Sequence, residues 1–204
     1  MSSVSEIKSV VFDFGGVIID LFPDRTSNRL YEYIDNSDRD KVLALALEVE
    51  LGRISGDEFL ESLGLLAKKN VSTSELEKIW NLMLGDIDRD KVIFMKELQS
   101  KYDIFLLSNT NIVHKNFFDK ICFDAFGMSS EDFFKATFYS HEINMRKPNS
   151  DIFSHVIKEI RMEAHNILFV DDLESNTETA KDLGMQVFDF KRNASFDCLN
   201  FLKV

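Results

Sequence analysis

Three short apolar runs along the chain each end abruptly at a polar residue. They are residues 9–12, 104–107 and 167–170, followed by Asp13, Ser108 and Asp171 respectively. A continuous apolar run that stops in this way is typical of a strand buried on both faces. Weaker patterns of the same kind predict strands at 136–140 and 186–190.

Helical periodicity separates these predicted strands. The predicted helices are residues 91–101, 112–121, 149–161 and 174–183, and Gly184 follows the last of them as a candidate C′ glycine. Strands that alternate with helices indicate right-handed βαβ units. The pattern therefore predicts an α/β fold with a Rossmann-like, three-layer core around a parallel sheet.

The segment from about Asp24 to Asp88 has a different pattern. It contains no convincing strand, and helical stretches recur at 26–34, 39–50, 56–68 and 73–84. Two of them begin with capping-box spacings, at Ser55 and Ser72. We therefore expect an all-helical cap at residues 23–88, inserted into a catalytic core formed by residues 1–22 and 89–204.

Composition narrows the classes of partner. The 204 residues carry 35 acidic and 24 basic side chains, a formal net charge of −11, which disfavours binding to nucleic acid or to an anionic membrane. With 45% hydrophobic residues the chain can bury a substantial core. No window approaches the roughly 18 consecutive apolar residues of a membrane span.

The cysteines and histidines show no metal-binding or disulfide pattern. Cys122 and Cys198 lie far apart, and the four histidines lack metal-binding spacings, which favours surface or hydrogen-bonded histidines. The first residues lack the features of a signal peptide. We expect a cytoplasmic, reducing setting.

The polar residues after the three strong strands are candidates for one site. Ligands of open parallel sheets bind beyond the carboxyl ends of the strands, so these side chains are expected to converge. The set comprises Asp13, Gly15, Ser108, Asn109, Asp171 and Asp172, with Lys147 before the next helix. Carboxylates suit Mg²⁺, while a lysine and a helix N-terminus suit an anion, so the set predicts phosphoryl transfer.

Each of these signals has an ordinary structural explanation when it stands alone. An aspartate at a strand end is often a turn or cap residue, and Ser-Asn-Thr before a helix is good capping chemistry. Lys147 beside a proline could be a solvated lysine. The functional interpretation depends on the joint occurrence of all four features, in order, at matching structural positions.

The chain resembles the haloacid-dehalogenase-like (HAD) superfamily. The stretches VFDFGGV (11–17), LSNT (107–110), RKP (146–148) and FVDD (169–172) are similar to its motifs I to IV. The helical segment after motif I resembles its C1-type cap. Within the superfamily, the motifs are similar to a bacterial branch that contains a glucose-1-phosphate phosphatase.

The resemblance implies a Mg²⁺-dependent phosphatase acting on a small-molecule phosphate ester. Asp13 would be the nucleophile and would form an aspartyl-phosphate. The metal would be held by Asp13, the Gly15 carbonyl and Asp172, with Asp171 as a ligand or helper. Ser108, the Asn109 backbone and Lys147 would bind the phosphoryl oxygens.

Gly15 departs from the usual pattern of these phosphatases, which have a second aspartate two positions after the nucleophile. That aspartate protonates the leaving group, and such help typically contributes about 10²- to 10⁴-fold in rate. We therefore expect a substrate with a better leaving group, such as a sugar 1-phosphate. Asp20 and Asp24 are alternative sources of a carboxylate, although capping or solvation explains them better.

Other functions remain open at this point. Gly15 is the one feature that favours a non-catalytic binding or regulatory protein on the same scaffold. Dehalogenation would use Asp13 without a metal, whereas a phosphomutase would want the missing aspartate. The chain has no G-x-x-x-x-G-K-[ST] motif, which disfavours P-loop chemistry. Arg25 and Arg53 are candidate substrate contacts in the cap, although ion pairing or solvation is the better expectation.

Overall fold

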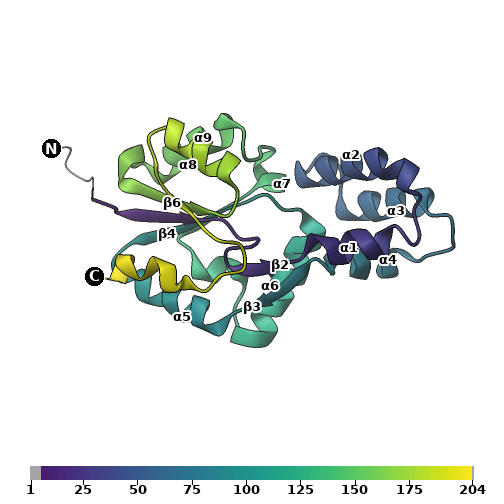
Figure 1. Ribbon diagram of the computed structural model, residues 1–204, viewed down its shortest axis with the longest axis horizontal. Coiled ribbons are helices and arrows are strands. Elements are labelled where there is room, and N and C mark those ends of the chain that lie inside the picture. Colours follow the sequence, from purple (N-terminus) through teal and green to yellow (C-terminus); the bar gives the residue numbers. More distant parts are fainter. Residues whose placement is uncertain (1–5, 204) are drawn as a thin grey trace.

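The computed structural model describes residues 6–203, in which five parallel strands form one sheet in the order β5-β4-β1-β6-β7. Helices cover both faces of this sheet, and α1–α4 lie beyond one end of it (Figure 1). The bounds of the sheet strands are β1 Ser9–Phe12, β4 Asp103–Ser108, β5 Ala136–Tyr139, β6 Ile167–Asp171 and β7 Gln186–Asp189. The predicted parallel α/β core is confirmed.

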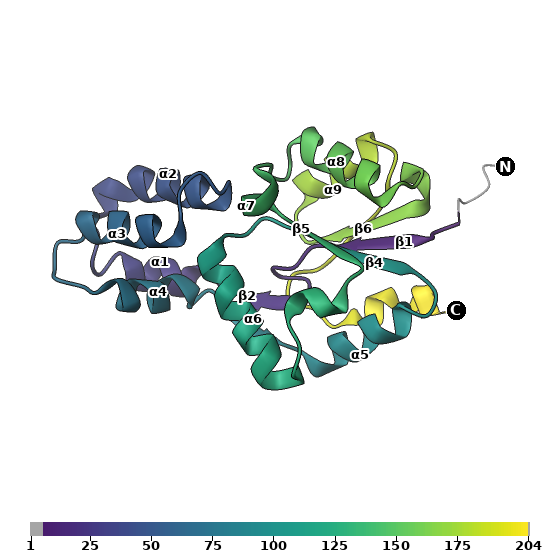
Figure 2. The same ribbon diagram turned by 180° about the vertical axis from the view of Figure 1, so that it is seen from behind.

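The apolar runs form strands because successive side chains point to opposite faces of a sheet that is buried on both sides. Val10 and Phe12 pack into one core cluster, while Val11 packs into another on the opposite face. Helices α8 (Ser150–Ile160) and α9 (Glu174–Asp182) lie over one face. Helices α5 (Arg89–Leu98) and α6 (Ile112–Phe126), with the C-terminal 3₁₀ helix η4 (Phe196–Lys203), lie on the other side (Figure 2).

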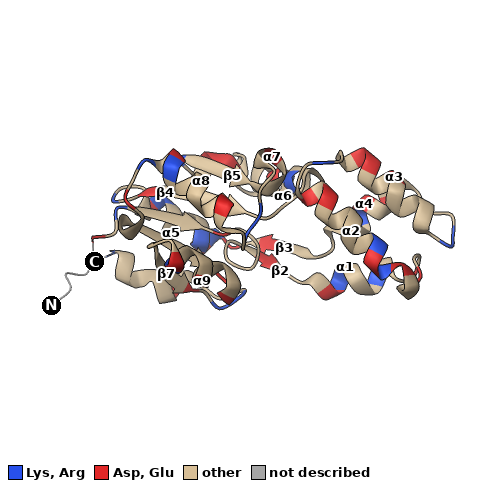
Figure 3. Ribbon diagram, turned by 90° about the horizontal axis from the view of Figure 1, so that it is seen from above, with Lys and Arg blue, Asp and Glu red and all other residues tan. Residues whose placement is uncertain are grey.

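Four helices after β1 form a separate group with its own apolar cluster. They are α1 (Pro23–Leu30), α2 (Arg39–Glu50), α3 (Gly56–Leu66) and α4 (Thr73–Asn81), and we call them the helical segment. Their core contains Leu30, Phe59 and Leu76, all buried. The capping box predicted at Ser55 forms, and the Ser72 hydroxyl accepts a hydrogen bond from the Glu75 amide. Acidic and basic residues both occur along these helices (Figure 3).

One expectation for residues 24–88 is wrong, because the region contains a strand. Strand β3 (Leu84–Ile87) pairs antiparallel with β2 (Ile19–Leu21), so a short ribbon carries the chain between the core and the helical segment. Gly85 and Asp86 interrupt the apolar pattern of β3, which is why it resembles a helix end. The close approach of the two strands favours Gly85, where a Cβ would lie 2.9 Å from the Asp20 Cβ.

The remaining elements are short. Helix α7 (Ser140–Ile143) follows β5, and 3₁₀ turns occupy η1 (Asn36–Asp38), η2 (Ser130–Phe133) and η3 (Ala164–Asn166). Gly184 adopts a φ of +88° after α9, as expected for a C′ glycine. Across residues 6–203, none of the helices combines the length and apolar character needed to cross a membrane.

Candidate active site

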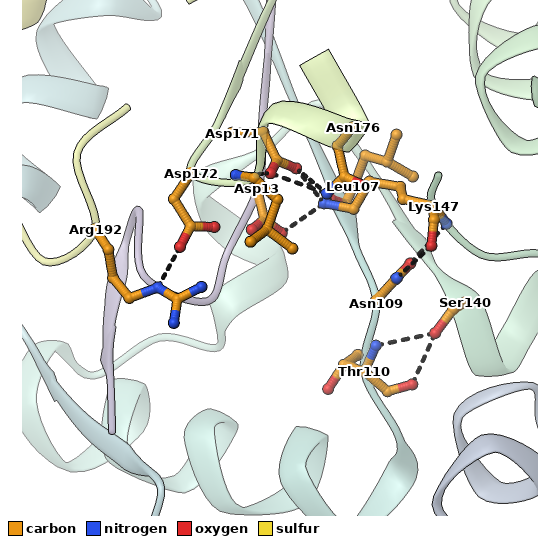
Figure 4. Close-up of polar contacts among 11 residues, drawn as sticks. Asp13, Leu107, Asn109, Thr110, Ser140, Lys147, Asp171, Asp172, Asn176 and Arg192 are labelled. Carbon is orange, nitrogen blue, oxygen red and sulfur yellow. Dashed lines mark hydrogen bonds and ion pairs between the residues drawn. The ribbon is translucent and has the colours of Figure 1, made fainter. Parts of the chain in front are cut away.

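The carboxyl ends of β1, β4 and β6 bring the predicted site residues together. Phe12 is in register with Leu106 of β4 and with Val170 of β6, so the next residues along these strands are neighbours. The Asp13 amide continues the ladder by donating to the Val170 carbonyl at 2.8 Å. Asp13 and Asp171 therefore face one another at a single edge of the sheet (Figure 4).

Lys147 lies between the two carboxylates. Its Nζ is 2.7 Å from Asp13 Oδ1 and 2.7 Å from Asp171 Oδ2, and it donates a third hydrogen bond to the Leu107 carbonyl at 2.9 Å. These partners use all three donors of the ammonium group. The residue is 2% exposed, so the solvated alternative for Lys147 is wrong.

The side chain of Asn109 fixes the backbone that carries Lys147. Asn109 Nδ2 donates to the Lys147 carbonyl at 2.9 Å, and Asn109 Oδ1 accepts from the Lys147 amide at 2.9 Å. A second pairing steadies the same loop, because Ser140 Oγ accepts from the Thr110 amide and donates to the Thr110 carbonyl, both at 2.9 Å. The residues after β4 are thus tied to the segment before α8.

Burial dominates the electrostatics of this cluster. It raises the pKa of Asp13 to about 7, although the Lys147 ammonium opposes the rise. Burial by itself would lower the pKa of Lys147, but the two carboxylates outweigh it and hold that pKa above its ordinary value. Lys147 therefore remains a cation at neutral pH.

Asp13, Asp171 and Asp172 each offer a carboxylate oxygen, and these oxygens lie within 4.8 Å of one another. Such a set of hard oxygen donors fits Mg²⁺. Asp171 already accepts hydrogen bonds from Lys147, from the Leu173 amide and, on both oxygens, from Asn176 Nδ2. Its oxygens are committed to protein donors, which leaves Asp13 and Asp172 better placed for a cation.

Asp172 has one partner of its own and a close backbone neighbour. Arg192 Nε donates to Asp172 Oδ2. Gly16 lies beside the same oxygen with a φ of +82°, and a Cβ on Gly16 would lie 2.8 Å from Asp172 Oδ2. Glycine is therefore required at position 16 both by conformation and by space.

A cavity of about 250 Å³ opens between this edge of the sheet and the helical segment. Gly15, Ser108 and Asn109 line it from the core, while Glu50 and Trp80 line it from the helical segment. Arg146, next to Lys147, pairs with Glu50 through Nε at 2.6 Å and links the two sides. A ligand that reaches the strand ends would therefore also meet α2 and α4.

The weaker candidates lie elsewhere. Asp20 and Asp24 do not line the cavity, and Asp20 Oδ1 is 3.6 Å from the buried Lys91. Arg25 stacks on the Phe22 ring at 3.9 Å, and Arg53 pairs with Glu48 at 2.9 Å, as the ordinary explanations expect.

Comparison with known proteins defines the family. Residues 7–184 match the model of the haloacid dehalogenase-like hydrolases. The D-ribitol-5-phosphate phosphatase of Bacteroides thetaiotaomicron is 30% identical over 196 residues, which cover 93% of this chain and 95% of the relative. The chain belongs to the haloacid dehalogenase-like hydrolase family, and the expected enzyme class is confirmed.

Solved structures agree with this assignment. A HAD family enzyme of Bacteroides thetaiotaomicron, in complex with magnesium and inorganic phosphate, superposes with a TM-score of 0.87 at 30% identity, covering 95% of this chain and 98% of that one. A structure from Porphyromonas gingivalis, described as a predicted HAD-like family hydrolase, has a TM-score of 0.86 at 28% identity, covering 97% of each chain.

Proposed function

We propose that this protein is a Mg²⁺-dependent phosphatase that hydrolyses a small phosphorylated metabolite through Asp13. The observation that carries the proposal is the position of Lys147, whose Nζ lies 2.7 Å from both Asp13 and Asp171 at the carboxyl edge of the sheet. A buried cation beside the nucleophilic carboxylate offsets part of the negative charge that a transferring phosphoryl group brings. The named activity of the Bacteroides relative, and the magnesium and phosphate of the solved enzyme, support it.

Each residue of the site has a role that follows from its chemistry. Asp13 attacks phosphorus, while Lys147 keeps the nucleophile in place and balances charge on the phosphoryl oxygens. The Ser108 hydroxyl and the backbone amide of Asn109 bind those oxygens. Asp13, the Gly15 carbonyl and Asp172 hold the metal, and Asp171 supports both Lys147 and the metal site. When bound, Mg²⁺ neutralises charge between the carboxylates and the phosphoryl group.

The reaction proceeds in two displacements. An Asp13 oxygen forms a bond to phosphorus while the bond from phosphorus to the ester oxygen breaks, and the departing alkoxide takes a proton from water. Water then attacks the aspartyl-phosphate, which releases inorganic phosphate and restores the Asp13 carboxylate. Residues 23–88 act as a cap that shields these steps from bulk solvent, over a core of residues 1–22 and 89–204.

Gly15 determines how basic a leaving group the enzyme can expel. It supplies no side-chain acid, so substrates with less basic leaving groups should react faster. A sugar 1-phosphate meets this requirement, because its anomeric oxygen is a better leaving group than a simple alkoxide. A polyol 5-phosphate, as in the name of the Bacteroides relative, is the second candidate. Its leaving group is a simple alkoxide, so its rate of hydrolysis shows whether the enzyme can expel a more basic leaving group.

The test is a panel of phosphate esters of graded leaving-group pKa, assayed with Mg²⁺ and with a chelator. The panel includes glucose 1-phosphate, glucose 6-phosphate and D-ribitol 5-phosphate. We expect chelator-sensitive hydrolysis whose rate rises as the leaving-group pKa falls. Equal rates for alkyl and aryl esters would contradict the role given to Gly15. No turnover on the whole panel would favour a non-catalytic HAD protein, and chelator-resistant dehalogenation would favour the other chemistry.

A further inference from the structure

Two aromatic rings that line the cavity, one from the helical segment and one from the core, stack on each other. Trp80 of α4 and His114 of α6 stack with their ring centroids 5.5 Å apart and their planes within 3°. Both line the cavity of about 250 Å³ that also contains Gly15 and Ser108. This stacked pair therefore borders the space that the non-phosphate part of a substrate would fill.

The hydrogen bonds of His114 define which of its nitrogens carries the proton. His114 is 8% exposed, and its Nδ1 lies 2.8 Å from Asn81 Oδ1. With the Asn81 amide in this orientation its oxygen only accepts, so the tautomer that forms this contact carries the proton on Nδ1 and keeps the lone pair on Nε2. The backbone amide of His114 donates to Asn111 Oδ1 at 3.0 Å, which fixes the start of α6 around the ring.

The other ring nitrogen has no protein partner. Across residues 6–203, no hydrogen bond or ion pair is recorded at His114 Nε2, and the indole Nε1 of Trp80 is buried without an acceptor. Unlike the indole nitrogen, His114 Nε2 is not closed off from solvent, so a molecule in the cavity can reach it. An acceptor thus remains free on a ring that lines the cavity.

We propose that His114 is a specificity-determining residue whose Nε2 accepts a hydrogen bond from a hydroxyl of the substrate's leaving group. This rests on the proposed phosphatase function. It assigns the substrate to the phosphate esters of polyhydroxylated carbon chains or rings, as opposed to aryl or plain alkyl phosphates. Trp80, which also lines the cavity, supplies apolar contact for the carbon skeleton, as aromatic rings commonly do.

The same environment excludes a role for His114 as the missing general acid. Burial lowers its pKa to about 3, so the imidazole is neutral at physiological pH and has no proton to give from Nε2. An acceptor that stays neutral suits recognition of a hydroxyl group.

The test compares ligands that match in carbon skeleton and differ in their hydroxyls. The pairs are D-ribitol 5-phosphate with n-pentyl phosphate, and myo-inositol 1-phosphate with cyclohexyl phosphate. The wild-type enzyme should prefer the hydroxylated member of at least one pair in kcat/KM. His114→Phe keeps the ring and removes the acceptor, so it should reduce that preference roughly 10- to 100-fold, mainly through KM. Activity on p-nitrophenyl phosphate, which has no hydroxyl to bind, should fall less than activity on the hydroxylated ester.

An unchanged preference in His114→Phe, or an equal loss on every ester, would overturn the proposal. Ligand binding can also be measured without turnover, in the Asp13→Asn protein with Mg²⁺. Calorimetric titration of the same ligand pairs into this protein, and into the double variant that also carries His114→Phe, gives the affinities. Failure of phosphatase activity would therefore be distinguishable from failure of this inference. Absence of any preference for the hydroxylated ligand in binding would also contradict it.

A measurement on the wild-type protein does not depend on whether the variant folds. In ¹⁵N-labelled wild-type protein at pH 7, the Nε2 resonance of His114 should be that of an unprotonated nitrogen. It should shift on addition of the preferred hydroxylated ester and remain in place with inorganic phosphate. A protonated Nε2, or no shift at saturation, would contradict the proposal.

Discussion

Both hydrogen-bonding groups of the Asn109 side chain bond to the backbone of Lys147, each at 2.9 Å. The Lys147 ammonium in turn contacts both buried carboxylates. The side-chain amide of Asn109 therefore positions the Lys147 ammonium. This role is separate from the one proposed for the Asn109 backbone amide, which is to bind the phosphoryl oxygens. This relationship leads to the first prediction.

Asn109→Ala should lower kcat by about 10- to 100-fold, because small displacements of a positioning group have effects of that size. Far-ultraviolet circular dichroism should remain unchanged. Asn116→Ala is the matched control, since Asn116 is exposed on α6 and should have no effect. Equal kcat values for the two variants would show that Asn109 does not position Lys147.

Lys147→Met should lower the free energy of unfolding at pH 8 by about 3–5 kcal/mol, because it leaves buried carboxylates without their cation. The pKa of Asp13 is already raised to about 7 by burial, and losing Lys147 would raise it further. The Asp13 carboxyl would then be mostly protonated at pH 5, so the loss should be smaller there than at pH 8. Urea denaturation at the two pH values provides the measurement, and a loss independent of pH would contradict this account.

Gly16→Ala should weaken Mg²⁺ binding at least about tenfold, because the new Cβ would displace the Asp172 carboxylate from which it would lie only 2.8 Å away. Gly127→Ala is the control, since Gly127 also has a positive φ, of +71°, but has nothing within 4 Å of the added Cβ. Both variants should lose about 1–2 kcal/mol of stability from backbone strain. Calorimetric titration with Mg²⁺ separates them, and equal affinities would contradict the prediction.

His114 should make the stability of the protein depend on pH in mildly acidic solution. Burial lowers its pKa from 6.5 to about 3, so below pH 6.5 the unfolded chain binds a proton that the folded protein does not. Stability contributed by this group is present above pH 6.5 and is lost as the pH falls toward 3, by up to about 1.4 kcal/mol per pH unit. The unfolding free energy of the wild type minus that of His114→Phe should decrease from pH 7 to pH 4.5. Parallel curves would contradict the low pKa.

The sequence predicted those parts of the fold whose signal is local. Ser9–Phe12 forms the predicted strand, and α3 (Gly56–Leu66) begins at the predicted residue, because a buried apolar run and the capping box at Ser55 are each readable without their neighbours. Strand β3 was missed, since Leu84–Ile87 contains a glycine and an aspartate and is held in place by pairing with β2.

The candidate site likewise has a part that local sequence signals predict and a part that depends on distant segments of the chain. Parallel strands bring their carboxyl ends to one edge, so Asp13, Ser108 and Asp171 could be grouped from sequence alone. The contacts of Asn176 and Arg192 with the aspartates could not, because they depend on how α9 and the loop after β7 fold back. The spacing of Asn176, five residues after Asp171 in the first turn of α9, is the one signal that could have indicated it.

The central claim is that Asp13 is the nucleophile of a Mg²⁺-dependent phosphatase. Its most direct test is the rate of inorganic phosphate release by the wild-type protein and by Asp13→Asn, with Mg²⁺ and the best ester of the panel. We expect chelator-sensitive release by the wild type and a fall of at least about 10³-fold in the variant. Release by Asp13→Asn at a rate close to that of the wild type would contradict it.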